Sequence, residues 1–373
     1  MTTRPEPPRR APRRSPVRRL IALGLIGAVA IAASGAALFG WYAGRVQRPF
    51  KGYTESERFV TIAPGMGVSA IGRRLLDAGI VSDRITFRLA VRLRGAERSL
   101  KAGEYRFSQA QSALDVADRI ARGDVYLVSI TFPEGLTIAA MADLFAERGL
   151  GTREAFRTAA RNAALVRSFD PVATDLEGYL FPDTYRLSRQ ASAADLVKQM
   201  VARFEEVFGP AQREQARAAG WSVRQAVTLA SLVEKETARA DERPIVAAVY
   251  VNRVRRNMGM QADPTVIYAL ERAGRYTGNL TRADLRFDSP YNTYRYAGLP
   301  PGPIASPGRA SLEAVLAPAD VPYLYFVSRN DASHVFATTL AEHNRNVRTF
   351  QVEYFRAQRA REREGAAGAP QPR

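Results

Sequence analysis

An uncharged apolar run near the N-terminus constrains the fold of this chain more than any other feature. Residues 20–39 form a run of 20 apolar or small residues without one charged side chain. A helix of about 20 such residues is long enough to cross the hydrocarbon core of a bilayer. Trp41 and Tyr42 follow, and aromatic side chains of this kind gather at membrane–water interfaces. The sequence therefore predicts a membrane anchor over residues 20–42.

The charges beside this run predict its orientation. Residues 1–19 contain seven arginines against one glutamate, and positive residues next to a membrane span stay in the cytoplasm. We therefore expect a cytoplasmic N-terminus, one span of the inner (plasma) membrane, and a periplasmic or extracytoplasmic chain from about residue 43. Small residues at 33–37 leave a cleaved signal peptide as an alternative. The apolar run is longer than the usual core of a signal peptide, which favours an uncleaved anchor.

Composition excludes several classes of site and partner. The chain has no cysteine, which excludes disulfides, thiol nucleophiles and cysteine zinc sites. Its two histidines, His334 and His343, are too few for a histidine-rich metal site. The net charge of +17 favours a polyanionic partner or a membrane surface. The predicted topology favours the membrane over nucleic acid, and the Arg-rich residues 357–373 are predicted to be a disordered tail.

An internal repeat follows a polar connector over 43–56. Residues 59–83 predict a short strand, a Pro-Gly turn, an amphipathic helix and a glycine stop. Residues 128–152 align with this unit without a gap. The identical pairs are Thr61 with Thr131, Gly65 with Gly135, Ala70 with Ala140 and Gly79 with Gly149. The unit resembles a LysM module, which holds glycans, so residues 57–127 are either a glycan-binding module or a packing module.

The rest of the chain predicts an α+β fold with short strands. Helices are expected over most of 153–175, throughout 191–219 and from about residue 340. Other segments with clear local patterns are a strand near 101–107, a helix at 112–122 capped by Ser112, helices at 241–257 and 266–272, and a hairpin pairing 324–327 with 334–336. The Pro- and Gly-rich residues 298–308 exclude a helix, and we expect them to form an ordered wall of a cleft.

One predicted helix carries a carboxylate in an unusual position. Within residues 222–239, Val223, Ala226, Val227 and Ala230 share one helical stripe, and Glu234 lies within it, about 20° from Val223. Burial raises the pKa of a carboxyl group, which suits a general acid at neutral pH. The alternative is a structural pair between Glu234 and a buried arginine. Glu236 points elsewhere on the wheel and is expected on a solvated face.

Six sequence motifs in fixed order resemble one family closely. They are ASLVEKET at 230–237, DPTVIY at 263–268, YNTY at 291–294, GLPPGPI at 298–304, YLYFV at 323–327 and EGYLFPDTY at 177–185. Together they resemble the endolytic murein transglycosylases of the YceG-like (MltG) family. The resemblance implies a catalytic domain over 128–356 that cleaves peptidoglycan glycan strands, and a working link to peptidoglycan synthases.

The resemblance also implies a mechanism and a catalytic residue. The family's acid/base residue maps onto Glu234, while Glu236 is expected to be structural. A protonated glutamate would donate to the glycosidic oxygen between N-acetylmuramic acid and N-acetylglucosamine. Its carboxylate would then take the proton of the muramic C6 hydroxyl, which closes onto C1 and leaves a 1,6-anhydro end. Because the nucleophile belongs to the substrate, no metal or other cofactor is expected.

The remaining site residues are hypotheses from side-chain type and position. Contacts to the sugars are predicted for Gln261, Tyr291, Asn292 and Tyr294, and Glu177 is the candidate for a second acidic group. Asp263 is a candidate N-cap for the helix that Pro264 begins, and His334 has either a structural or a site role.

Two other functions stay open at this point. A muramidase that hydrolyses the same bond with two carboxylates would need a second essential residue, such as Glu177 or Asp183. A wall-binding scaffold without activity would use Glu234 only for structure. A function in DNA binding is suggested by the charge alone and is opposed by the predicted topology.

Overall fold

The computed structural model of the chain describes residues 16–359, so most of the predicted basic head and tail lies outside the described residues. The chain divides into two compact units, residues 1–127 and 128–373, and each is described by itself. The short strands and many helices confirm the α+β class. The finer domain boundaries, and the LysM-like character of the first unit, stay predictions.

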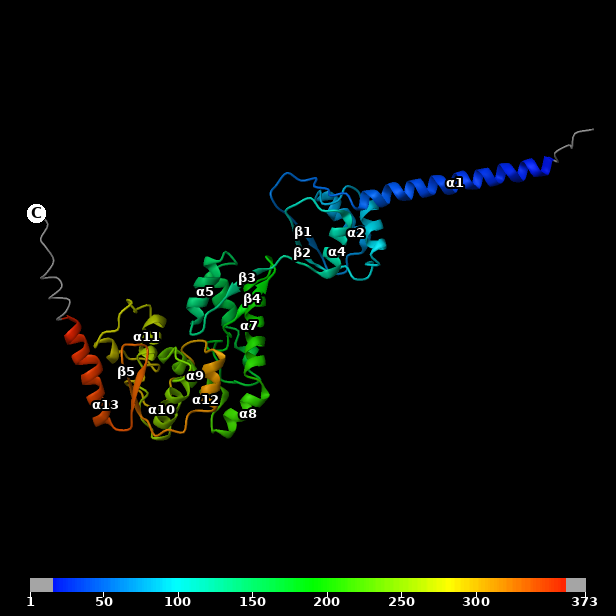
Figure 1. Cartoon of the computed structure of the whole chain (residues 1–373). Coiled ribbons are helices and arrows are strands. Elements are labelled where there is room, and N and C mark those ends of the chain that lie inside the picture. The colour runs from blue at the N-terminus through cyan, green and yellow to red at the C-terminus, as the bar shows by residue number, and fades with distance from the viewer. Residues whose placement is uncertain (1–15, 360–373) are drawn as a thin grey trace, which may run out of the picture. The chain divides into compact units, whose positions relative to one another are not determined.

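The apolar run forms one long helix. Helix α1 spans Pro16–Val46, and Leu23–Val46 is long and apolar enough to cross a membrane (Figure 1). The helix extends past the predicted end at residue 42, so the first part of the expected connector is helical. Its end is fastened to unit 1, because Val46 is buried in the unit's core and Arg45 pairs with Asp83 at 3.2 Å.

Unit 1 is a two-stranded antiparallel sheet with three helices. Strand β1 (Arg58–Ile62) pairs with β2 (Gly103–Phe107), so that Val60 lies opposite Tyr105. The helices are α2 (Val68–Asp77), α3 (Arg84–Leu93) and α4 (Ala113–Arg122). Ser112 caps α4 as predicted, in a reciprocal capping box with Asp115. Apolar side chains from all five elements form one core, as expected for a unit with its own hydrophobic cluster.

Unit 2 begins with the second copy of the repeat, which the structure confirms. Strand β3 (Val128–Thr131) leads through a turn into α5 (Ile138–Glu147), as β1 leads into α2. Gly65 and Gly135 adopt φ of +80° and +75° in the two turns. Gly79 and Gly149 adopt φ of +71° and +68° after the two helices. Only glycine takes this conformation without strain, which explains why the repeat retains these positions.

Strand β4 and four helices complete the first half of unit 2. Strand β4 (Thr184–Leu187) pairs antiparallel with β3. Around it lie α6 (Arg153–Ala160), the 3₁₀ turn Ala163–Val166, α7 (Ala193–Val207) and α8 (Pro210–Ala218). The prediction of a single helix over 191–219 is wrong, because Gly209 interrupts it and Pro210 begins a new helix, as proline does at a first turn.

The centre of unit 2 is helix α9, Val223–Glu236. Ser222 caps it in a capping box with Gln225, and every residue from Ala226 to Val233 is buried. Helices α10 (Arg243–Arg255), α11 (Asp263–Arg272) and α12 (Arg309–Leu316) pack against it (Figure 1). A helix that is buried on all sides lies in the core of its domain. The packing of helix α9 therefore fixes the position of the side chains on its last turn.

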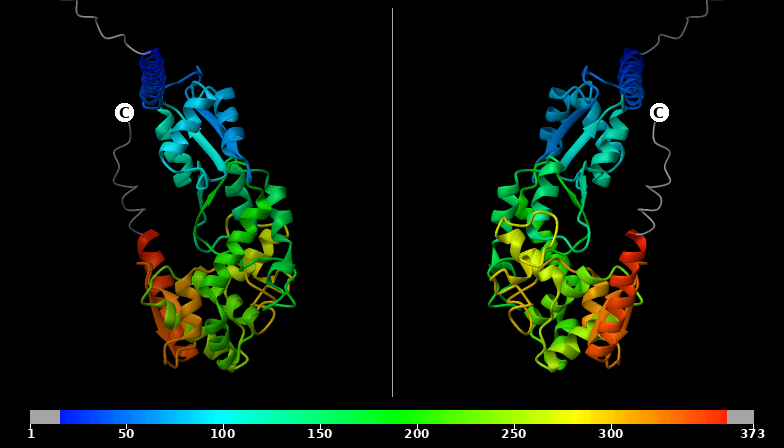
Figure 2. Two further views of the ribbon diagram at one scale, coloured as in Figure 1. Left: turned by 90° about the vertical axis from the view of Figure 1, so that its right-hand side faces the viewer. Right: turned by 90° about the vertical axis from the view of Figure 1, so that its left-hand side faces the viewer.

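The C-terminal part of the described chain is a hairpin and a helix. Strands β5 (Tyr325–Ser328) and β6 (His334–Ala337) pair as predicted. Helix α13 (Leu340–Val347) follows and contacts both strands, and the chain continues through a π-helical turn at Arg348–Glu353 (Figure 2).

The Pro- and Gly-rich segment is ordered, as expected, but its second half is part of the core. Residues 302–308 are buried, and the Ile304 N–H donates to Ser231 Oγ of α9 at 3.1 Å. The Ser306 carbonyl accepts from Gly135 N–H at 2.9 Å, which joins the segment to the turn of the second repeat. These residues therefore fill the interior and do not form the exposed cleft wall that the sequence suggested.

Gly178 offers a test of how tightly this core is packed. A Cβ atom at Gly178, whose φ is +83°, would lie 2.5 Å from Pro303 and 3.0 Å from Val227. We expect Gly178→Ala to lower the free energy of unfolding of unit 2 by roughly 2 kcal/mol or more, from backbone strain and overpacking together. Gly149→Ala is the matched control, because its φ is +68° and nothing lies near its Cβ. Urea unfolding of both variants measures the difference, and equal losses would contradict a packing effect.

Candidate active site

A cavity of about 430 Å³ opens at the C-terminal end of α9. It lies wholly within unit 2, and its walls come from α9, α10, the start of α11, the segment after residue 290, the β5 strand and α13. The lining residues are Glu236, Tyr250, Arg253, Met260, Gln261, Asp263, Tyr294, Phe326, Val327, His343 and Val347. A hollow that combines aromatic faces with a few acidic and hydroxyl groups is typical of a site for a polar ring such as a sugar.

Glu236 is the carboxylate that α9 presents to this cavity. Burial, with a smaller contribution from the charge of Asp263, raises the pKa of Glu236 to about 7. The Tyr250 hydroxyl donates to Glu236 Oε1 at 2.9 Å, and this bond and Arg253 act in the opposite direction. A carboxyl group with a pKa near 7 is partly protonated at neutral pH, which is the condition for a general acid.

A second acidic group lies across the cavity. Asp263 is the first residue of α11, and its Oδ1 accepts from the Tyr294 hydroxyl at 2.7 Å. Gln261 is held beside it with an unusual positive φ of +48°, where its N–H donates to the Thr293 carbonyl. The predicted sugar contacts Gln261 and Tyr294 thus both line the cavity that holds Glu236.

Arg253 and the hairpin support the far wall. The Arg253 guanidinium donates to the carbonyls of Leu324, Gly259 and Met260, so it joins β5 to the loop before α11. The ring of Phe326 meets the ring of Tyr250 edge-on, with centroids 6.0 Å apart. Tyr250 is therefore fixed by packing on one side and by its bond to Glu236 on the other.

Glu234 has a different environment, although only one residue separates it from Glu236. Its Oε2 accepts from the Gly308 N–H at 3.0 Å and from the Ser311 hydroxyl at 2.7 Å, at the N-terminus of α12. Arg243 lies 3.9 Å from its other oxygen, and the side chain is 7% exposed. Hydrogen-bond donors, a cation and a helix N-terminus thus surround this carboxyl group. The predicted burial of Glu234 is confirmed, and its contacts match the structural pair with arginine.

The expectation that Glu236 faces solvent is wrong. The wheel placed it off the apolar stripe of α9, which is correct for the helix alone. Tyr250 and Asp263, from α10 and α11, enclose that side of the last turn. Partners from other helices decide the burial of Glu236, and a pattern within one helix does not report them.

Two of the predicted sugar contacts lie elsewhere. Asn292 is fully buried and donates to the carbonyls of Leu285 and Phe287 in its own segment, and it does not line the cavity at Glu236. The Tyr291 ring packs against Tyr268 at 5.0 Å, and its hydroxyl accepts from Arg272. Tyr291 is therefore placed among aromatic and cationic neighbours that are not part of the cavity at Glu236.

Glu177 lines a separate cavity of about 290 Å³. It is buried, and burial raises its pKa to about 8. Its oxygens accept from the Ile138 N–H at the start of α5, at 3.0 Å, and from the Tyr268 hydroxyl at 3.1 Å. Glu177 thus joins α5 to α11, and none of its hydrogen bonds involves Glu234 or Glu236.

Two further predictions concern single side chains. Asp263 does not cap α11, because Ala262 holds the cap position and the Asp263 carboxylate faces Tyr294. His334 Nδ1 lies 2.6 Å from Glu242 Oε2, and its backbone N–H donates to Glu242 Oε1. Its contacts therefore match the structural role. Within residues 16–359, no group of three or more acidic or histidine side chains is placed to hold a metal ion.

The sequence did not single out Glu134, which lies beside Glu234. Burial and the charge of Glu234 raise the pKa of Glu134, while Arg243 lowers it. Its carboxylate fills the space where a side chain at Gly308 would otherwise extend. The repeat contained a signal, because the second copy has Glu134 where the first has Pro64.

The sequence profile of the YceG-like family matches residues 60–349. The chain belongs to the YceG-like family. It is 31% identical to the endolytic murein transglycosylase of Bacillus subtilis (strain 168), over 77% of this chain and 82% of that protein. The protein of the same name in Streptococcus pneumoniae (strain D39) is 30% identical over 78% of this chain, but only 58% of the longer pneumococcal protein is covered.

A solved structure extends the relationship to the fold. A YceG-like protein of Listeria monocytogenes is 30% identical and superposes with a TM-score of 0.53, over 78% of this chain and 99% of that chain. The family profile begins in β1 of unit 1 and ends in unit 2, so the residues that it matches include parts of both units.

We expect replacement of Glu234 and of Glu236 by glutamine to change the free energy of unfolding in opposite directions. We expect Glu234→Gln to lower the free energy of unfolding at pH 7 by about 1–3 kcal/mol, because it leaves Arg243 and the α12 N-terminus without their anion. Chemical unfolding followed by circular dichroism provides the measurement. An unchanged stability would contradict a structural role for Glu234.

Glu236 should make stability fall as pH rises. Its folded pKa, about 7, lies above the ordinary value of 4.5, so the folded state holds an extra proton between these values. The resulting stabilisation is complete below pH 4.5 and is lost as pH rises through 7, up to about 3 kcal/mol. We expect Glu236→Gln to remove this loss, so that the variant exceeds the native chain in stability above pH 7. Parallel pH profiles of the two proteins would contradict the shifted pKa.

Proposed function

We propose that this chain is an endolytic transglycosylase of peptidoglycan, a lyase that cleaves glycan strands internally and leaves 1,6-anhydro-muramic ends. The observation that carries the proposal is a carboxyl group with a pKa near 7, enclosed in a cavity with aromatic and hydroxyl groups. The names of the relatives, endolytic murein transglycosylases at about 30% identity, supply the substrate class and the type of reaction.

We assign the acid/base role to Glu236 instead of the predicted Glu234. An acid must give up a proton in the site and take one back, which requires a pKa near the working pH and access to the ligand. Glu236 lines the cavity and has a raised pKa. Glu234 is enclosed by two hydrogen-bond donors and Arg243, and it is not among the residues that line the cavity.

The reaction can be completed with this one carboxyl group. Protonated Glu236 donates its proton to the glycosidic oxygen, and the bond from that oxygen to C1 of the muramic residue breaks. The new carboxylate, to which Tyr250 donates, accepts the proton of the C6 hydroxyl as that oxygen bonds to C1. The electron pair of the broken bond stays on the leaving sugar, and Glu236 is protonated again. The attacking hydroxyl belongs to the same ring, so its proximity replaces a bound water.

Other residues of the cavity contribute binding and charge. The Asp263 carboxylate, held by Tyr294, favours the positive charge that develops at C1. Gln261 is positioned to hydrogen-bond to a sugar, and the Phe326 face suits the apolar side of a ring. Helix α1 would anchor the enzyme in the plasma membrane with the catalytic unit outside the cytoplasm, as the charge of residues 1–19 predicts.

Product analysis tests the reaction and the acid in one experiment. The full chain in detergent is incubated with uncrosslinked glycan strands, and the chain ends are identified by mass spectrometry. We expect internal cuts with 1,6-anhydro ends, and a fall in rate of at least about a hundredfold in Glu236→Gln. Products heavier by one water would show that a hydrolase is present instead.

Glu234→Gln is the matched control for this assignment. It removes the neighbouring carboxylate of the same helix turn and should retain most of the activity per folded molecule. A variant that is folded by circular dichroism yet inactive would transfer the acid role from Glu236 to Glu234. Full activity in Glu236→Gln would exclude the proposed mechanism at this cavity.

A further inference from the structure

Helix α3 of unit 1 has a basic stripe with no acidic residue in the helix. Arg84, Arg88 and Arg92 follow each other at intervals of four, so they lie along one side of the helix within about 80°. All three are exposed, and none of them makes an ion pair within the part of the chain that the structure describes. The residues of α3 read RITFRLAVRL, so no carboxylate offsets this charge.

An apolar stripe adjoins the basic one. Ile85 is 58% exposed and Leu93 is 50% exposed, with Leu89 half-buried between them. At about 100° per residue these three side chains occupy the sector next to the arginines. The remaining sector, with Phe87 and Val91, is buried in the core of unit 1. Helix α3 therefore exposes an amphipathic face to solvent, and no other element of unit 1 covers this face.

The structure fastens this helix to the end of α1. Helix α3 contacts α1 at the end of α1 that enters unit 1. Asp83 caps α3 by accepting from the Thr86 N–H at 2.8 Å, and its other oxygen pairs with Arg45 in the last turn of α1. The amphipathic face thus begins where the membrane-crossing helix ends.

The junction itself has the composition of a membrane–water interface. A cavity of about 260 Å³ is lined there by Trp41, Arg45, Arg48, Pro49, Phe50 and Ser82. The Arg45 guanidinium lies over the Trp41 ring, 4.7 Å from its centroid. Tryptophan and arginine side chains are the residues that hold a protein at the level of lipid headgroups.

We propose that the α3 face docks on the outer surface of the bilayer and binds anionic phospholipids. Arginines attract the headgroups, and the apolar stripe enters the boundary between headgroups and acyl chains, as in interfacial amphipathic helices. Phospholipid is the expected occupant because the face continues from a helix that crosses the membrane and because its charge is wholly positive. The proposal rests on the proposed anchoring of α1, but not on the catalytic role of unit 2.

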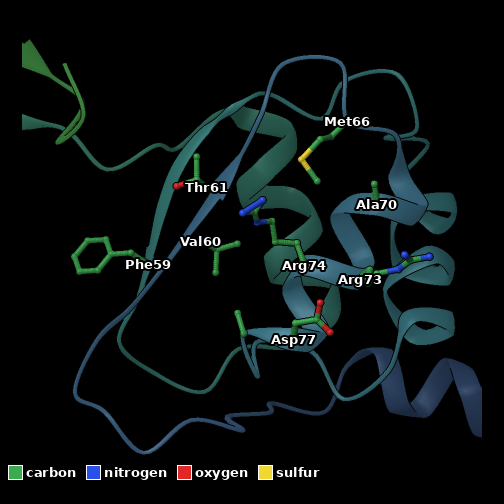
Figure 3. A pocket seen from close by; sticks show the side chains of 9 residues that line it. Phe59, Val60, Thr61, Met66, Ala70, Arg73, Arg74 and Asp77 are labelled. Atoms are coloured by element: carbon green, nitrogen blue, oxygen red, sulfur yellow. The ribbon is translucent and has the colours of Figure 1, made fainter. Parts of the chain in front are cut away.

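A cavity between β1 and α2 of unit 1 is a separate feature and carries no part of this proposal. It measures about 560 Å³ and lies between β1 and α2 (Figure 3). Arg74 extends across it towards β1, while Arg73 points away. Glycan binding at this cavity stays a prediction from the LysM resemblance.

The absence of cysteine makes the proposal directly testable. Ile85→Cys in the full chain is labelled with a fluorophore and reconstituted into vesicles of phosphatidylcholine, or of equal parts phosphatidylcholine and phosphatidylglycerol. We expect quenchers attached to the lipid to quench the label in the anionic vesicles, and iodide in the water to have little access to it. Leu93→Cys, labelled in the same way, checks that the result does not depend on one substitution.

The matched controls separate docking from anchoring. A label at Asp124→Cys, in the segment between α4 and β3, should stay open to iodide in both vesicles. Replacing Arg84, Arg88 and Arg92 by glutamine should lower the ratio of docked to undocked molecules roughly fivefold for each arginine removed.

Several results would overturn the proposal. They are a label at residue 85 that is equally open to iodide in both vesicles, a glutamine variant that docks as well as the native chain, and protection that appears only when glycan strands or a second copy of the chain are added. A chain that does not float with the vesicles would overturn both anchoring and docking. The cleavage assay on the same variants is independent, so lost activity with intact docking would count only against the proposed function.

Discussion

The burial of the middle of α9, from Ala226 to Val233, is the constraint on which unit 2 depends. Helices α10, α11 and α12 cover it, so its last turn emerges from the core at a fixed place and in a fixed rotation. Two residues along a helix correspond to a rotation of about 200°, so their side chains point to nearly opposite sides. Glu234 and Glu236 therefore meet opposite surroundings, and neither can exchange places with the other without unpacking the helix.

The environments of these two carboxylates separate their chemistry. Glu234 meets the N-terminus of α12 and Arg243, and so it joins α9 to two neighbouring helices. Glu236 meets Tyr250 and a cavity, where burial disfavours charge. A glutamate thus joins helices at position 234 and, in the proposed reaction, exchanges a proton at position 236. The difference comes from the side chains and backbone groups that the neighbouring helices place around each carboxyl group.

Local patterns predicted the local structure well. The repeat, the cap at Ser112 and the final hairpin depend on nearby residues, and the structure confirms them. The break at Gly209 was visible in the sequence, yet the helical pattern on both sides obscured it. The environment of Glu236 could not be predicted in this way, because it depends on Tyr250 and Asp263, which are distant in sequence from the last turn of α9. Motif resemblance singled out the last turn of α9, and only tertiary contacts distinguish the two acids of that turn.

Asp83 both caps α3 and pairs with Arg45 of α1, and this pair of contacts has a mechanical consequence. Burial alone would raise its pKa, but hydrogen bonds from Thr86 and Ser82 and the charge of Arg45 lower it overall, so the carboxylate stays charged. A pull along α1 therefore reaches α3 through an ion pair and the buried Val46, and no slack linker lies between them to absorb it. Lateral drag on the anchor in a moving membrane would be transmitted to the first unit as a force on its core.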